Sequence, residues 1–199
     1  MRIPSIIALL VAAVATVEVS AQSTEATREI PKEKQTSLGL YVTAKEAFEK
    51  WKAEPEQVKV LDVRTPEEYM FVGHAEMAWN IPWWIMTHQW DDEKDRYVMI
   101  PNREFVAQVK ELAEPKDTIL VMCRSGDRAA MAVDALAKAG FTNVYNIIHG
   151  MEGDTVDDPE NLYHGKRMKN GWKNSGSPWT YKIDRERAWV PEDEKPATN

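Results

Sequence analysis

The chain is organised around residues 118–128, which read TILVMCRSGDR, and residues 129–139, which read AAMAVDALAKA. The apolar run at 118–122 predicts a buried parallel strand, because such strands are covered on both faces. The second stretch is rich in Ala, Leu and Lys and predicts a helix that ends at Gly140. Cys123 is therefore expected at the carboxyl end of a strand, on a tight loop that leads into a helix. Open α/β sheets place their reactive groups at that edge.

The composition of this loop favours a reactive cysteine. Backbone N–H groups of residues 124–128 can surround the sulfur, and the helix dipole adds partial positive charge. Arg124 and Arg128 add full charges, so we expect a lowered thiol pKa and a thiolate at neutral pH. Gly126 permits the tight turn. The alternative is an inert buried cysteine, which is common for a lone thiol, but the flanking arginines argue against apolar burial.

Four motifs occur in a fixed order along the chain. They are LDVRTPEEY at 61–69, GH at 73–74, NIP at 80–82 and CRSGDR at 123–128. Together they resemble a rhodanese domain, the family of single-cysteine sulfurtransferases. The resemblance covers residues 38–180 and implies an α/β rhodanese-like fold, with a central, mostly parallel sheet and helices on both faces. Segments near 83–101 and 154–170 depart from the family pattern and are interpreted as insertions.

Other segments flank this domain. Arg2 precedes an apolar run at 6–17, which is too short for a membrane span, and small residues precede Gln22. Residues 1–21 therefore predict a secretory signal peptide cleaved after Ala21, and an exported, periplasmic protein without membrane attachment after cleavage. Residues 22–37 are expected to form a flexible linker and residues 181–199 a polar tail.

Composition limits the classes of function. A chain of 199 residues has room for one α/β domain with a real core. The net charge of −7 argues against binding to nucleic acid or to anionic membranes. A lone cysteine in an exported chain either forms an intermolecular bridge or is a reactive thiol, and the loop composition favours the reactive thiol. The spacing of His and Cys predicts no metal site, and no cofactor is expected.

Local patterns predict the elements of the domain. Thr43 begins a capping box with Glu46, while Thr65 and Pro66 occupy the N-cap and first positions of a second helix. Gly73 ends that second helix. Strands are expected at 38–42, 58–63, 79–81, 118–122 and 144–148, and helices at 44–54, 66–72, 102–112 and 129–139.

Two features have more than one interpretation. Asp62 and Arg64 lie where their strand leaves the sheet, at the edge where Cys123 is also expected. They form either a structural ion pair or, as the resemblance implies, a pair near the active loop. The tryptophan-rich insertion at 83–101 either buries its own aromatic rings or forms an apolar wall or docking face beside Cys123.

The resemblance implies a sulfurtransferase in which Cys123 carries a persulfide between a donor such as thiosulfate and a thiol or cyanide acceptor. The loop amides would stabilise the anionic persulfide. In this reading Arg124 orients the donor, Arg128 anchors the loop and Ser125 donates a hydrogen bond, with Gly126 and Asp127 completing the loop.

Two alternatives remain. The first is a non-catalytic persulfide carrier that docks on an exported protein partner. The second is a phosphatase or arsenate reductase, which is disfavoured because four residues separate Cys123 from Arg128, one fewer than those enzymes use.

Overall fold

Five parallel strands form the centre of the molecule. The structure is a computed structural model, and it describes residues 29–191 and 194. The predicted signal peptide and the start of the predicted linker lie outside the described residues. Within the described part of the chain, no helix is long and apolar enough to cross a membrane. The strands, in spatial order, are β1 (Tyr41–Val42), β8 (Val144–Ile147), β7 (Thr118–Met122), β2 (Val58–Asp62) and β4 (Trp79–Asn80).

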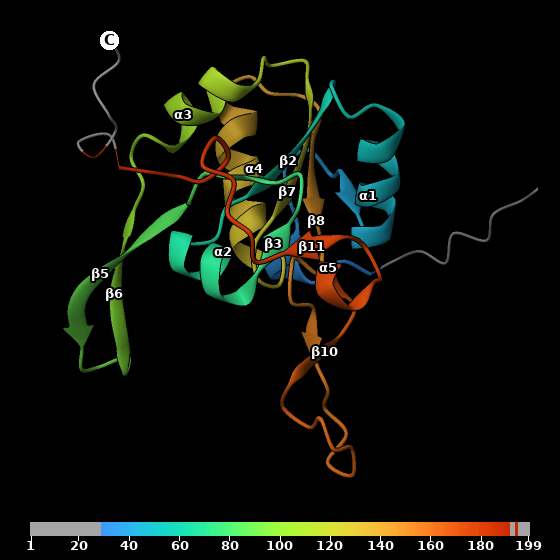
Figure 1. Ribbon diagram of the computed structural model, residues 1–199, viewed down its shortest axis with the longest axis vertical. Helices are drawn as coiled ribbons and strands as arrows, with labels where there is room; N and C mark the ends of the chain where they lie inside the picture. The colour runs from blue at the N-terminus through green and yellow to red at the C-terminus, as the bar shows by residue number, and fades with distance from the viewer. Residues whose placement is uncertain (1–28, 192–193, 195–199) are drawn as a thin grey trace, which may run out of the picture.

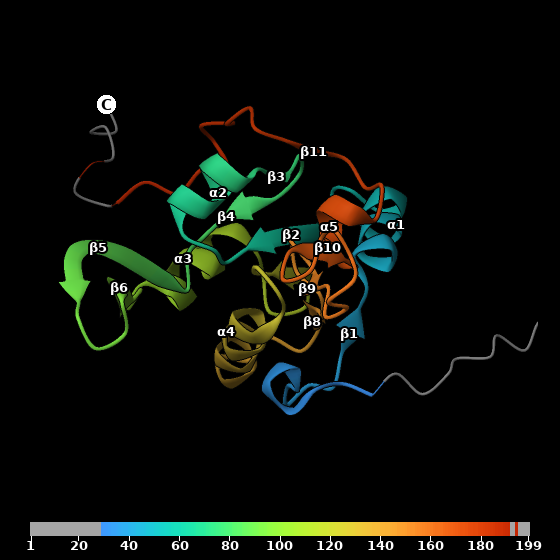
Figure 2. The same ribbon diagram turned by 90° about the horizontal axis from the view of Figure 1, so that it is seen from below.

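Helices cover both faces of this sheet, as expected (Figure 2). The α-helices are α1 (Ala44–Ala53), α2 (Pro66–Val72), α3 (Phe105–Leu112), α4 (Asp127–Lys138) and α5 (Gly171–Asn174). Successive side chains of a strand point to opposite faces. Ile119 and Val121 therefore pack with α3 and α4, while Leu120 and Met122 pack with α1, α2 and α5. The β7 strand is thus apolar on both faces, as its unbroken apolar run predicts.

Helix ends follow the local signals in most places. Thr43 and Thr65 both form complete capping boxes, and Gly140 follows α4 with φ 95°. The α4 helix begins at Asp127, two residues earlier than predicted, because Gly126 adopts a left-handed conformation at the N-cap. The α3 helix begins later than predicted, since the side chain of Asn102 accepts a bond from the backbone of Glu104 instead of continuing the helix.

The two predicted insertions are both two-stranded and both project from the body of the domain (Figure 1). The first is an antiparallel hairpin of β5 (Trp84–Asp91) and β6 (Arg96–Pro101), with irregular pairing between Met86 and Trp90. The second contains β9 (Asp154–Thr155) and β10 (Arg167–Lys169).

The segments before and after the domain are more ordered than expected. Within the predicted flexible linker, Lys32–Lys34 form a short 3-10 helix (η1), and the carbonyl of Lys34 accepts a hydrogen bond from the buried side chain of Asn146. The expectation of a flexible linker is therefore wrong for this part, because specific contacts with the domain hold it.

The chain beyond residue 178 also lies against the domain. β11 (Trp179–Thr180) pairs with β3 (His74–Ala75), and the backbone of Asn80 donates to the carbonyl of Arg187 at 2.8 Å. Farther along, the indole of Trp189 donates to Gln108 at 3.2 Å. The predicted polar tail therefore extends the packed domain to at least Trp189.

Candidate active site

Cys123 follows directly after β7 and is fully buried beneath its own loop. The backbone N–H of Gly126 donates to the sulfur at 3.1 Å. The thiol in turn lies 3.6 Å from a carboxylate oxygen of Asp127, which also accepts a bond from the hydroxyl of Ser125 at 3.0 Å. The loop thus wraps the sulfur as the motif predicts, but Ser125 bonds to Asp127 and Asp127 contacts the sulfur directly.

The turn that follows β8 supports this loop from behind. The backbone of Met151 donates to the carbonyl of Cys123 at 2.7 Å, and that of Glu152 to the carbonyl of Arg124 at 3.0 Å. Gly150 has φ 55°, and a Cβ there would lie 2.3 Å from the carbonyl oxygen of Cys123. Gly126 is equally confined, since its Cβ would lie 2.4 Å from the carbonyl of Ile148. Both positions therefore need glycine.

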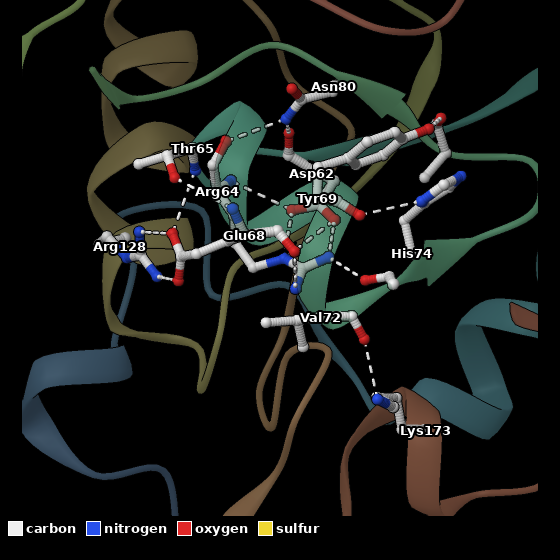
Figure 3. Close-up of polar contacts among 12 residues, drawn as sticks. Asp62, Arg64, Thr65, Glu68, Tyr69, Val72, His74, Asn80, Arg128 and Lys173 are labelled. Carbon is white, nitrogen blue, oxygen red and sulfur yellow. Dashed lines mark hydrogen bonds and ion pairs between the residues drawn. The ribbon is translucent and has the colours of Figure 1, made fainter. Parts of the chain in front are cut away.

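Arg128 anchors the loop to α2. Its two terminal nitrogens each donate to a carboxylate oxygen of Glu68 at 2.7 Å (Figure 3). Burial by itself would raise the pKa of the Glu68 carboxyl, but the hydrogen bonds and charge of Arg128 lower it overall. The same carboxylate accepts a bond from the backbone of Thr65, so one side chain caps α2 and holds the loop.

Asp62 and Arg64 form a separate, fully buried ion pair (Figure 3). The guanidinium donates to both carboxylate oxygens, at 2.6–3.0 Å, and also to the carbonyl of Gly73 at 2.8 Å. Burial opposes the charge on Arg64, yet the Asp62 carboxylate raises the pKa of Arg64 overall. The pair fixes the end of β2 and the end of α2, which is the structural interpretation. Asp62 also lies opposite Met122 in the neighbouring strand, one residue before Cys123, so the pair is near the loop as well.

The expectation of a lowered thiol pKa is wrong for this conformation. Burial raises the pKa of the Cys123 thiol, and the nearby carboxylate of Asp127 raises it further. The charge of Arg128 and the N–H groups of Ala129 and Gly126 act in the opposite direction but do not compensate. The arginines and the loop amides are visible in the sequence, but the removal of the sulfur from solvent depends on how the loop folds over it.

Asp127 itself remains ionised at neutral pH. Partial burial would raise the pKa of its carboxyl, but the bond from Ser125, its own backbone N–H and that of Arg128 lower the pKa overall. The sulfur is therefore covered by an anion that is held in place by its own loop.

A hollow of about 310 Å³ lies between this loop, the start of α2 and the β5–β6 hairpin. It is lined by Thr65, Glu68, Trp84, Met86, Arg96, Met99, Arg124, Asp127 and Arg128. A larger hollow of about 500 Å³ lies between β4, α3 and residues 186–190, but none of its lining residues belongs to the 123–128 loop. A further hollow of about 500 Å³, between η1 and the second insertion, touches the loop at Ser125 alone, whereas the smaller hollow is lined by Arg124, Asp127 and Arg128. The smaller hollow is therefore the candidate active-site pocket, and it lies beside the buried sulfur rather than exposing it.

The aromatic residues of the first insertion have three different surroundings. Trp83 packs edge-on against Phe105 of α3, with ring centroids 5.1 Å apart, and so belongs to the core. Trp84 lines the active-site pocket. Trp90 and Tyr97 contact each other near the hairpin tip and are about half exposed, at 51% and 47%. Burial of aromatic rings thus describes Trp83, whereas a wall beside the active site describes Trp84.

Several site residues had no clear signal in the sequence. Glu68 was visible only within a family motif at the start of α2, and its bond to Arg128 spans 60 residues. Trp84, Met86, Arg96 and Met99 lie in the insertion at 83–101. The sequence offered an apolar wall beside Cys123 as one interpretation of this insertion, but it predicted neither the hairpin nor the place of Arg96. No cluster of three or more His, Cys, Asp or Glu residues with metal-binding geometry occurs in the described ranges.

The second insertion lies on the other side of the loop. Asp154 contacts His149 at 2.7 Å and Lys34 at 3.2 Å. His149 occupies the place where the family resemblance leads one to expect a first glycine. The segment after the closing turn is therefore tied to η1 by charged contacts.

Comparison with known proteins agrees with this architecture. A family model described as "Rhodanese-like domain" matches residues 44–155. Among curated proteins, the chain is 40% identical over 89 residues to thiosulfate sulfurtransferase 18 of Arabidopsis thaliana, covering 44% of this chain and 59% of that protein. It is 37% identical over 92 residues to the senescence-associated protein DIN1 of Raphanus sativus, covering 46% and 45%. The chain thus spans about half the length of these relatives.

A solved structure supports the same assignment. The crystal structure of Rv0390 from M. tuberculosis superimposes with a TM-score of 0.55 at 26% sequence identity, covering 71% of this chain and 96% of that one. The family match spans more than half of the chain, including the strand, loop and helix around Cys123. The chain therefore belongs to the family of proteins with a rhodanese-like domain.

Proposed function

We propose that the protein is a sulfurtransferase that carries sulfur on Cys123. The observation that supports this most directly is a single cysteine at the carboxyl edge of a parallel sheet, with the N–H of Gly126 donating to its sulfur. Such donors stabilise a sulfur anion better than a neutral thiol. The relation to thiosulfate sulfurtransferases points to the same chemistry.

In the loading step, the thiolate of Cys123 attacks the outer sulfur of a donor such as thiosulfate. The S–S bond of the donor breaks, and sulfite leaves with the bonding electron pair. The product is a persulfide anion on Cys123, and no external oxidant or reductant is needed. Since burial and the Asp127 carboxylate raise the thiol pKa in the closed loop, Asp127 must move aside before the donor can reach the sulfur. The thiol proton then leaves to solvent, and the amide of Gly126 stabilises the thiolate that remains.

In the transfer step, an acceptor thiolate or cyanide attacks the outer sulfur of the persulfide. The S–S bond to Cys123 breaks, and Cys123 keeps the electron pair as a thiolate. Arg128 is committed to Glu68 and so acts as an anchoring residue, whereas Arg124 is exposed and lines the pocket. Arg124 is therefore the loop arginine available to attract an anionic donor.

A persulfide carrier is the second candidate. The complete burial of the sulfur favours it, because a buried persulfide is protected from hydrolysis and oxidation. Steady-state turnover with thiosulfate and cyanide separates the candidates: many turnovers identify a catalyst, whereas a single loading without turnover identifies a carrier. A phosphatase or arsenate reductase is disfavoured, because only four residues separate Cys123 from Arg128 and because the guanidinium of Arg128 is bound to Glu68 rather than free to hold a phosphate.

The Cys123→Ser variant tests the chemistry. Sulfur transfer from thiosulfate to cyanide should fall by at least about a thousand-fold, since a serine hydroxyl is not ionised at neutral pH. Circular dichroism should show an unchanged fold, because the side chains are nearly equal in size. Transfer near the wild-type rate would overturn the proposal.

We further propose that residues 1–21 direct export to the periplasm. The support is the basic residue, apolar run and small residues at the start of the chain. Cell fractionation with mass analysis of the mature chain tests this. An N-terminus at Gln22 in the periplasmic fraction is the expected result, and an uncleaved cytosolic chain contradicts it.

A further inference from the structure

The active-site pocket combines an apolar wall with positive charge. Trp84, Met86 and Met99 line it from the hairpin, with Met86 and Met99 directly opposite each other across the two strands. Trp and Met side chains offer broad, polarisable surfaces for the carbon skeleton of a ligand. A small inorganic ion such as thiosulfate has no carbon skeleton that could pack against such a wall.

The charges of the pocket are unevenly distributed. Glu68 and Arg128 neutralise each other through two hydrogen bonds. Asp127 places its negative charge against the sulfur. The remaining cations are Arg96 on the hairpin and Arg124 on the loop, and neither side chain forms an ion pair within the described residues. The site is therefore negative beside the sulfur and positive along its wall.

Size supports the same reading. A hollow of about 310 Å³ is at the lower end of the range for small organic ligands. Thiosulfate would fill only a fraction of it and would bring its charge close to Asp127. A ligand that presents a thiol toward Cys123 and a separate anionic group toward the wall matches both the volume and the charge pattern.

We propose that this pocket binds the organic part of a carboxylate-bearing acceptor thiol, with Arg96 as the residue that selects the carboxylate. The inference rests on the proposed sulfurtransferase function and names its acceptor class. The thiolate of the acceptor attacks the outer sulfur of the Cys123 persulfide, and the new S–S bond replaces the one that breaks. Arg96 takes no part in that step: it forms a hydrogen-bonded ion pair with the carboxylate of the bound thiol.

The test loads Cys123 from thiosulfate and measures transfer to three small thiols: mercaptopropionate, which is anionic, mercaptoethanol, which is neutral, and cysteamine, which is cationic. Each variant is compared with wild type for the same thiol, so that differences in thiol basicity cancel. Arg96→Gln should lower kcat/KM for mercaptopropionate about three- to tenfold, as expected for loss of a partly exposed ion pair. The kcat/KM for mercaptoethanol should change less than about twofold. The kcat/KM for cysteamine should be unchanged or higher.

Two further variants make the result specific. Arg96→Lys should retain part of the preference for mercaptopropionate that Arg96→Gln loses, because it keeps the positive charge. Arg103→Gln is the matched control: Arg103 is exposed, lies just before α3 and does not line the pocket, so all three thiols should react as in wild type. An equal loss for all three thiols in Arg96→Gln, or no loss for any, would overturn the inference.

Failure of the inference is distinguishable from failure of the proposed function. If Cys123 loads with sulfur and transfers it, but Arg96→Gln leaves the preference unchanged, only the inference is wrong. If Cys123 does not load with sulfur, both are wrong.

Discussion

The 123–128 loop and the β5–β6 hairpin meet at one pocket, but they are held in the fold by different means. The loop is fixed from several sides, by Glu68 through Arg128 and by the backbone N–H groups of Met151 and Glu152. The hairpin projects from the domain, and Trp90 and Tyr97 near its tip are about half exposed (Figure 1). The wall that it contributes can therefore change without disturbing the sulfur site.

The difference indicates that the loop and the hairpin have separate roles. Sulfur chemistry needs fixed backbone donors around one atom, which a buried loop provides. Selection among substrates needs only a few side chains on one wall. If the two parts are separate, substitutions in the loop and its supports should affect stability and thiol chemistry, whereas substitutions in the hairpin wall should affect the choice of substrate.

The largest effect is expected where the fixed part is most buried. Arg64→Met should lower the free energy of unfolding by about 3–5 kcal/mol, because it leaves the carboxylate of Asp62 buried without its partner. The matched Arg124→Met, at an exposed loop position, should change it by less than about 0.5 kcal/mol. Urea unfolding measures both. Similar losses for the two variants would mean that the exposed loop arginine is also structural.

A pair of adjacent tryptophans divides core from pocket within the hairpin segment. Trp83→Ala should lower the free energy of unfolding by about 2–4 kcal/mol, since the ring packs against Phe105 in the core. Trp84→Ala should lower the free energy of unfolding by no more than about 1 kcal/mol, because this ring lines the pocket and packs against neither core cluster, although both rings are partly buried. If thermal unfolding shows the reverse order, the hairpin wall is part of the core.

Glu68 links the helix to the loop and should show a pH-dependent effect. Glu68→Gln should lower stability by about 1–3 kcal/mol at neutral pH, through loss of charged hydrogen bonds. The pKa of this carboxyl is lowered in the fold, so its contribution is present above its unfolded value of about 4.3 and is lost as pH falls through the folded pKa. The difference between variant and wild type should therefore shrink in acid. A difference that stays constant with pH would contradict this role.

The smallest effect expected is a shift in the titration of the thiol. Burial and the charge of Asp127 raise the pKa of Cys123, so thiolate absorbance should appear above the usual range of a free thiol. Asp127→Asn should lower the midpoint, since it removes one of the two causes. The Cys123→Ser variant supplies the tyrosine background to subtract. A midpoint that is unchanged in Asp127→Asn would show that the carboxylate does not act on the sulfur.

The sequence predicted much of this architecture because local signals and the apolar pattern agree. The unbroken run before Cys123 predicted the central strand, and the threonine caps predicted two helix starts. Gly126 was predicted to turn the loop, although the carbonyl of Ile148 that requires it comes from the turn after β8. These features depend on residues close together in the chain or on the two-sided burial of a strand.

What the sequence could not predict depends on distant contacts. The pairing of Arg128 with Glu68 joins residues far apart in the chain, and the raised thiol pKa depends on how completely the loop closes. The ordered segments around η1 and Trp189 looked like polar, non-periodic chain. Their backbone and side-chain bonds to the domain become visible only when the fold is assembled.

The central claim is that Cys123 accepts sulfur within this loop. The most direct measurement is the intact mass of the protein after exposure to thiosulfate, followed by removal of excess donor. The account predicts the added mass of one sulfur atom on the wild type, its loss on addition of cyanide, and no addition to Cys123→Ser. An unchanged wild-type mass, or the same addition to the serine variant, would contradict it.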